Sequence, residues 1–201
     1  MEKISADRRR QVNGAPNLNA IPEQMRHLAM EAWEQGDALG ITCLAGHADR
    51  GQLLFDNIQQ FRKAGIYEKA LFKTFIHGPT MPPDNWQFLF SFADLEKLHA
   101  CGGPVPTFNM TVFRGVNNCR QRRWIRGPSW TSNPSTAAWF ASRFTFPDAN
   151  PALYSVCVRP EHVLFVTNDR SEEEVVVAIW QCSKIKRVSP MPAAIKPGST
   201  K

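Results

Sequence analysis

Three consecutive acidic residues, Glu172 to Glu174, run directly into a β-branched segment, Val175 to Val177. If this stretch is an extended strand, successive side chains point to opposite faces, so Glu172 and Glu174 share one face and Glu173 lies on the other. Two carboxylates at this spacing suit the orientation of a cationic nucleophile and the stabilisation of a developing positive charge. The pair is therefore a candidate for chemistry on a cation.

Two structural readings of the same residues compete with a catalytic one. Ser171 and Glu174 have the spacing of a helix capping box, with acidic residues in the first turn. The β-branched residues that follow, together with Ile179 and Trp180, favour a strand instead. A solvated acidic turn that leads into an ordinary strand fits equally well, so the acidic stretch alone does not indicate function.

Two other short segments carry groups suited to binding a nucleotide. Arg114 follows an aromatic residue at the end of an expected strand and precedes Gly115. A planar guanidinium suits bidentate contact with phosphate or carboxylate, and glycine allows a ligand to approach the backbone. Ser129 and Thr131 are two residues apart, so their hydroxyls share a face if the segment is a strand. Each segment is weak alone, but the three in this order are much more specific.

In this order the segments resemble the R-S-E class of mono-ADP-ribosyltransferases, the arginine-modifying branch that includes binary actin-modifying toxins and vertebrate ecto-enzymes. That family has an aromatic-Arg-Gly strand, a Ser-Thr-Ser strand followed by a helix with Ala-x-x-Phe, and a Glu-x-Glu motif at a strand start. Residues 113–115, 129–131 with 137–140, and 172–174 stand in those places here. Trp130 and Thr131 replace the family's usual Thr and Ser, although Thr131 keeps a hydroxyl. The resemblance covers about residues 108–190.

The resemblance implies a reaction with NAD as co-substrate and without a metal. Glu174 would be the catalytic glutamate, bonded to the ribose 2′-hydroxyl, and Glu172 would orient and help deprotonate the acceptor. Ser129 would bond the nicotinamide ribose and help position Glu174. Arg114 would bind the NAD phosphates or the adjacent ribose, and the backbone of Gly115 would hold the nicotinamide amide.

The resemblance also assigns Thr131 to the NAD site and implies that Phe140 would stack on the nicotinamide. The loop ahead of the acidic stretch, about residues 167–171, would select the acceptor protein. A basic loop from Arg120 to Arg126 either lines the phosphate site or forms solvated surface.

The chemistry of the residues agrees with this activity. Breaking the nicotinamide glycosidic bond builds positive charge on the ribose, as in glycoside hydrolysis, and a prepositioned carboxylate stabilises that charge in the transition state. An arginine acceptor is protonated at neutral pH, so a second carboxylate is needed to hold it and take its proton. We expect transfer of ADP-ribose from NAD to a protein side chain, most directly arginine. The alternatives are NAD hydrolysis at the same site, the binding or modification of nucleic acid, and a non-catalytic interaction domain in which the motif is coincidental.

Composition sets broader expectations. A net charge of +6 and a pI near 9.3 favour anionic partners, while scattered cysteines, five in number, indicate reduced thiols in a cytosolic setting. No apolar stretch is long enough to span a membrane, and no cleaved secretion signal is recognisable. These features fit a cytoplasmic enzyme, or a bacterial or phage toxin or effector delivered into a target cell. Its partners would be a protein substrate and an inhibitor or immunity protein.

The patterning predicts an α+β chain in four parts. Residues 1–20 form a flexible basic arm, 21–104 a helical part, 105–190 a β-rich catalytic core, and 191–201 a flexible tail. A short apolar run, Ile41 to Ala45, reads as a strand within the helical part. The resemblance implies a helical N-terminal half packed on a split, mainly antiparallel two-sheet core of the ADP-ribosyltransferase type.

Overall fold

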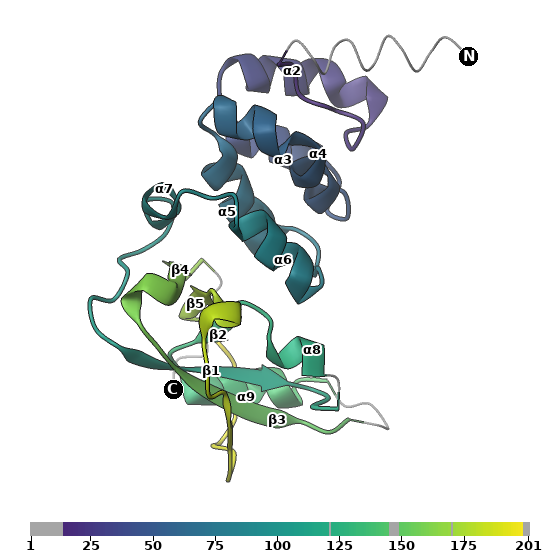
Figure 1. The fold of residues 1–201 in the computed structure, drawn as a ribbon. Helices are drawn as coiled ribbons and strands as arrows, with labels where there is room; N and C mark the ends of the chain where they lie inside the picture. Colours follow the sequence, from purple (N-terminus) through teal and green to yellow (C-terminus); the bar gives the residue numbers. More distant parts are fainter. Residues whose placement is uncertain (1–13, 121, 145–148, 170, 199–201) are drawn as a thin grey trace. The chain divides into compact units, whose positions relative to one another are not determined.

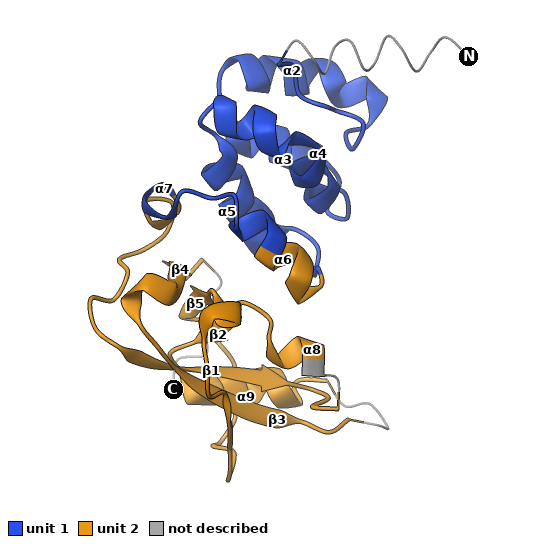
Figure 2. Cartoon of the chain, viewed as in Figure 1, with its two compact units in different colours: residues 1–81, 88–97 blue, residues 82–87, 98–201 orange. Residues whose placement is uncertain are grey.

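The computed structural model describes residues 14–120, 122–144, 149–169 and 171–198. Most of the predicted basic arm and the last residues of the predicted tail lie outside these ranges. The chain forms two compact units (Figure 2): unit 1 contains residues 1–81 and 88–97, and unit 2 contains residues 82–87 and 98–201. Helices dominate the first unit and strands the second, which confirms the predicted α+β class.

Unit 1 is built from helices whose apolar faces meet in a common core. The fully buried side chains include Ile41, Leu53, Leu54, Phe61, Tyr67 and Leu71. Glycines with left-handed backbones, Gly36 and Gly65, follow the first and third of these helices, as expected for helix stops. The helices, some of which extend into unit 2, are α2 (Arg26–Glu34), α3 (Ala38–Leu44), α4 (Arg50–Lys63), α5 (Tyr67–His77), α6 (Pro83–Phe90) and α7 (Leu95–His99).

The segment ahead of the first helix is anchored on α4. The fully buried side chain of Asn57 accepts a hydrogen bond from the Asn17 amide at 2.5 Å and donates one to the Asn17 carbonyl at 2.7 Å. Asn57 itself departs from helical geometry (φ −126°), so α4 is kinked at this position. Asn17, in the described end of the predicted arm, is therefore held on α4 by two partly buried hydrogen bonds.

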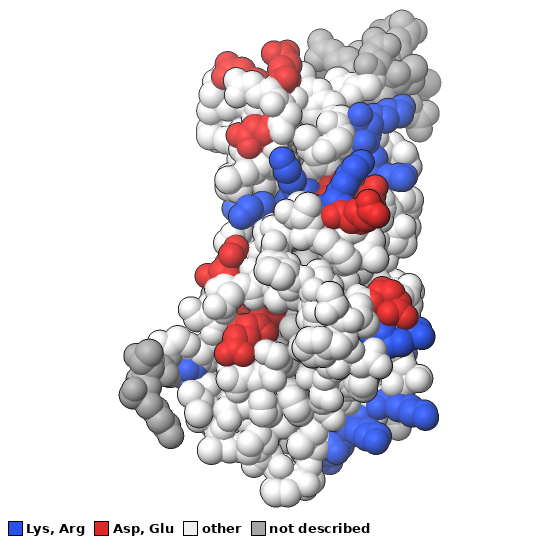
Figure 3. Space-filling model, turned by 90° about the vertical axis from the view of Figure 1, so that its left-hand side faces the viewer, with Lys and Arg blue, Asp and Glu red and all other residues white. Residues whose placement is uncertain are grey.

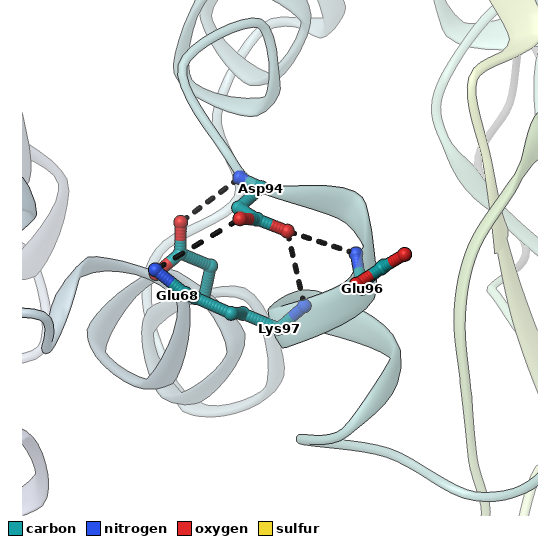
Figure 4. A network of polar contacts seen from close by, with 4 residues as sticks. All are labelled: Glu68, Asp94, Glu96 and Lys97. Carbon is teal, nitrogen blue, oxygen red and sulfur yellow. Dashed lines mark hydrogen bonds and ion pairs between the residues drawn. The ribbon is translucent and has the colours of Figure 1, made fainter.

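A small polar network fixes the start of α7 within unit 1 (Figure 4). The carboxylate of Glu68, a residue only 6 % exposed, accepts a hydrogen bond from the Asp94 amide at 2.9 Å. The Asp94 carboxylate in turn accepts from the amides of Glu96 and Lys97 at 3.1 and 3.3 Å. Because these are the amides that a helix start leaves without partners, Asp94 acts as an N-cap and Glu68 holds it in place.

Unit 2 contains one six-stranded sheet in the order β4-β5-β2-β1-β3-β6, with every neighbouring pair antiparallel (Figure 1). Its helices are α8 (Arg122–Ile125) and α9 (Pro134–Ser142), and short 3₁₀ helices cover Glu23–Met25 in unit 1 and Pro160–His162 and Ile179–Gln181 here. The strands are β1 (Met110–Val116), β2 (Ser129–Thr131), β3 (Ala152–Val158), β4 (Val163–Thr167), β5 (Glu174–Val177) and β6 (Lys186–Val188).

The expected two sheets form one sheet in the structure. Its two halves meet at a weakly paired boundary between β1 and β2, called the seam below. β1 and β2 are joined through one residue pair, Phe113 opposite Thr131, whereas β1 pairs with β3 along its whole length. The short β2, only three residues long, limits how far the two halves can pair. The described strands are therefore continuous across the seam, and the two-sheet expectation is corrected to a single sheet.

One face of this sheet forms the main apolar core of unit 2. Trp130 and Val175 lie opposite each other on β2 and β5 and are both almost fully buried, together with Val177 and Val112. β5 is buried on both faces, because Glu174 and Val176 on the opposite face are as buried as Val175 and Val177. Among the described residues, no helix has the length and apolarity needed to cross a membrane.

Helix α9 packs on β1 and β3 (Figure 1). Asn133 caps its start by accepting from the amides of Ser135 and Thr136. The closest approach is at Gly115, where an added Cβ would lie 2.6 Å from the Ala141 amide nitrogen and overlap the Ala137 carbonyl. The absence of a side chain at residue 115 is therefore required for the helix to reach the strand.

We expect Gly115→Ala to destabilise unit 2 by at least about 2 kcal/mol, because the added methyl group must push α9 away from β1. Urea denaturation followed by tryptophan fluorescence would measure the change. Gly103→Ala is the matched control, since its Cβ would meet the Val166 carbonyl at an ordinary 3.6 Å. Equal effects of the two substitutions would contradict the packing role of Gly115.

Candidate active site

The three segments singled out in the sequence are neighbours in the sheet. β5, β2 and β1 lie side by side, so Glu174, Ser129 and Arg114 come together from distant parts of the chain. Thr131 lies opposite Glu174 on one side and opposite Phe113 on the other. Directly opposed residues share a face, so the Ser129, Thr131 and Glu174 side chains leave the same face of the sheet.

Ser129 and Glu174 are joined by a short hydrogen bond. The Ser129 hydroxyl donates to Glu174 Oε1 at 2.5 Å. Ser129 lies opposite Val176, two residues along β5, so the bonded pair is diagonal across the two strands. Glu174 is only 3 % exposed, and a buried carboxylate is tolerated only where it is hydrogen-bonded. The bond therefore both stabilises the carboxylate and fixes its orientation.

Arg114 is bonded to the backbone on the other side of Ser129. Its Nε donates to the Trp124 carbonyl at 2.8 Å, and Nη1 donates to the Ser129 carbonyl. Burial lowers the pKa of the Arg114 guanidinium to about 10, and the nearby Glu174 carboxylate opposes this shift. The guanidinium thus acts as a clamp across the seam between β1 and β2, where strand pairing is limited to one residue pair.

Space for this clamp depends on Gly127. A Cβ at this position would lie 2.5 Å from Arg114 Nη2, so any larger residue would displace the guanidinium. No role was assigned to Gly127 from the sequence alone. The available signal was a glycine two residues before the strand that carries Ser129.

The position of Arg114 differs from that of an arginine pointing freely into a phosphate site. It adjoins Phe113, whose partner is Thr131, so its side chain leaves β1 on the face opposite to Ser129 and Glu174. The guanidinium nevertheless reaches the Ser129 carbonyl, because carbonyl groups lie close to the plane of the sheet. At least two of its N–H donors are engaged by the protein itself.

Glu172 lies outside the strand that was expected to carry it. β5 begins at Glu174, while Ser171 and Glu173 have left-handed backbones with φ of 56° and 49°. Side chains do not alternate between the two faces where the backbone is left-handed. The prediction that Glu172 and Glu174 share one face of a strand is therefore corrected. The Glu172 carbonyl instead accepts a hydrogen bond from the Thr131 hydroxyl at 2.8 Å.

The other two predicted ligand-binding residues lie on or against α9. The α-carbon of Gly115 faces the backbone of that helix, so packing accounts for this glycine without a ligand. Phe140 is half-buried on α9, with the Arg143 guanidinium carbon 4.6 Å from its ring centroid and the Trp139 ring 5.1 Å away. It retains exposed surface for a further contact.

The predicted basic loop presents its charges mainly to solvent. Arg120, Arg123 and Arg126 are exposed, and the Arg123 guanidinium lies 5.2 Å from the Trp124 ring centroid. On the face shown in Figure 3, acidic and basic side chains are interspersed over the helical unit and do not form one basic patch. The described residues contain no group of three or more His, Cys, Asp or Glu side chains arranged to hold a metal ion.

Comparisons with protein-family models, with curated proteins and with solved structures found no match.

We expect Arg114→Lys to destabilise the protein by about 1–3 kcal/mol, because one ammonium group cannot serve both carbonyls and leaves a buried acceptor without a donor. Urea denaturation would measure the loss. Arg126→Lys, which alters an exposed arginine nearby, is the control and should change stability by less than about 0.5 kcal/mol. If both variants unfold at the wild-type midpoint, the clamp does not contribute to stability.

Proposed function

We propose that this protein is a mono-ADP-ribosyltransferase that moves ADP-ribose from NAD to a protein arginine and releases nicotinamide. The hydrogen bond between Ser129 and Glu174 is the observation that carries the proposal. It supplies a buried, oriented carboxylate beside a strand hydroxyl, which is the arrangement that cleavage of the nicotinamide–ribose bond requires.

In the proposed reaction, a guanidinium nitrogen of the acceptor attacks ribose C1′ as the bond from C1′ to nicotinamide breaks. The bonding electron pair passes to the nicotinamide ring, and the acceptor loses one proton. Glu174 bonds the ribose 2′-hydroxyl and stabilises the positive charge that develops on the sugar. Glu172 holds the acceptor guanidinium and takes its proton.

Arg114 has a supporting role in this proposal. Its bonds to the carbonyls of Trp124 and Ser129 hold the start of β2 against β1, and its charge lies close enough to Glu174 to interact with it. It thereby fixes the hydroxyl that orients Glu174. The edge of the same guanidinium, the backbone at Gly115 and the Phe140 ring would then contact NAD.

NAD hydrolysis is the second candidate, and the position of Glu172 favours it. Because Glu172 belongs to the segment before β5 and not to the strand, the acceptor side of the site is less rigidly built than the side around Glu174. Water can take the place of an absent acceptor. In either case the setting we propose is a cytoplasm, that of the producing cell or of a target cell, with an inhibitor protein as a further partner.

We expect Glu174→Gln to lower nicotinamide release from NAD by about 10²–10³-fold, because the neutral amide cannot stabilise the developing charge. NAD affinity should change little, since the amide oxygen still accepts from Ser129. Nicotinamide release and calorimetric NAD titration would measure the two quantities. Glu161→Gln, an exposed acid paired with Arg159, is the control. A variant with wild-type turnover would rule out this mechanism.

We expect Glu172→Gln to reduce transfer to protein at least about tenfold more than it reduces NAD hydrolysis. Only transfer requires a carboxylate to hold a protonated guanidinium and take its proton, whereas an attacking water can lose its proton to the solvent. Labelled NAD and a cell lysate, with mass spectrometry of the modified residues, would give both rates. Equal losses in the two reactions would contradict the acceptor role of Glu172. Label on nucleic acid instead of protein would support the nucleic-acid alternative.

A further inference from the structure

The segment before β5 is held on the end of β2 by residues that the proposed chemistry does not use. The Ser132 hydroxyl donates to Glu173 Oε2 at 2.9 Å, and the Ser132 amide donates to the Glu173 carbonyl at 3.4 Å. The Glu173 amide donates to Asn168 Oδ1 at 3.1 Å. Glu173 thus has its amide, its carbonyl and its carboxylate all hydrogen-bonded, by partners from two different segments.

These bonds compensate for an unfavourable backbone conformation. Glu173 has a φ of 49°, in the left-handed region that residues with a side chain rarely adopt. Such a conformation persists only where the surrounding contacts enforce it. Glu173 is itself exposed, so burial of its side chain does not enforce it. The hydrogen bonds of Glu173 with Ser132 and Asn168, together with the bond from Thr131 to the Glu172 carbonyl, hold this segment in its path.

The path of this segment determines the position of the Glu172 α-carbon, from which its side chain extends. Glu172 lies between two left-handed residues, Ser171 and Glu173, and its carbonyl accepts from Thr131 at 2.8 Å. Its α-carbon is consequently placed by contacts with the end of β2, whereas Glu174 is placed by strand pairing with β2. The separation of the two carboxylates thus depends on how firmly the segment is attached to β2.

We infer that Ser132, Glu173 and Asn168 form a latch that positions Glu172 beside Glu174, and that this latch sets the partition of ADP-ribose between an acceptor side chain and water. The inference rests on the proposed function. Hydrolysis needs one oriented carboxylate, Glu174, which the latch does not touch. Transfer needs Glu172 at a fixed separation as well, so it alone depends on the latch. Ser132 and Glu173 are positioning residues and do not contact the substrate in this scheme. Asn168 belongs to the loop expected to select the acceptor protein, and its part in the latch is to accept from the Glu173 amide.

The experiment uses the full chain with Ser132→Ala, Glu173→Ala, the double variant and Asn168→Ala. Glu173→Gln is the conservative variant, because its amide oxygen still accepts from Ser132. Ala and Glu have similar conformational free-energy costs at a positive φ. The Glu173→Ala variant therefore reports on the loss of the carboxylate and not on a change in backbone strain. Glu161→Ala, which removes another exposed acid of unit 2, is the control.

Two measurements are made on every variant. The first is the ratio of protein labelling to NAD hydrolysis. The second is amide hydrogen exchange at Glu173 and Ser132, whose N–H groups are part of the latch. Exchange depends on the hydrogen bonds themselves and does not require activity.

We expect each alanine variant to lower the transfer-to-hydrolysis ratio about threefold to tenfold, the range that corresponds to one side-chain hydrogen bond, with hydrolysis itself nearly unchanged. The Ser132→Ala and Glu173→Ala effects should be non-additive, because both remove the same bond. Asn168→Ala should accelerate exchange at the Glu173 amide. Glu173→Gln and Glu161→Ala should match the wild type.

The outcomes separate this inference from the proposed function. Wild-type transfer with an unchanged ratio in all alanine variants would overturn the latch and leave the proposed function standing. Equal losses of transfer and hydrolysis would also overturn it, because the residues would then have only a general structural role. If the wild-type protein does not cleave NAD, the proposed function and the positioning role both fail, even where exchange increases in the variants.

Discussion

The structure of the candidate site depends on one partly buried arginine. The sheet of unit 2 is narrowest between β1 and β2, and there the Arg114 guanidinium takes over the function of strand pairing by donating to the carbonyls of Trp124 and Ser129. Burying a guanidinium is costly unless its donors are satisfied, and this cost appears as its lowered pKa. The hydrogen bonds of Arg114 therefore hold β1 and β2 in a fixed position at the seam. Without them, the two strands would be joined there by one residue pair alone.

Ser129 connects Arg114 to Glu174. Its carbonyl accepts from Arg114 and its hydroxyl donates to Glu174, so one short strand connects a partly buried cation to a buried carboxylate. Neither charge is exposed enough for water to screen it fully, and each moderates the cost of burying the other. A carboxylate held in this way is suited to stabilising a cationic transition state, because it does not have to reorganise as charge develops.

The two carboxylates of the proposed mechanism are held by different physical means. Glu174 belongs to a strand and is placed by backbone pairing, which is cooperative with the rest of the sheet. Glu172 is placed by single hydrogen bonds from Thr131 and from the neighbouring latch, which are individually weak. This difference gives a physical basis for one protein to favour either transfer or hydrolysis, according to the strength of a few contacts outside the reacting groups.

The sequence by itself determined that the first half of the chain is helical and the second half β-rich, and which residue types could form a nucleotide site, because alternation, helix caps and glycine stops are local properties. It did not determine that Ile41 to Ala45 lies mostly in helix α3, where the Asp37 cap and packing outweigh β-branched propensity. Only the tertiary structure decided that Arg114 bonds two carbonyls, that Gly115 admits a helix, and that Glu172 leaves the strand. Each of these depends on contacts between residues far apart in the chain, which no local pattern encodes.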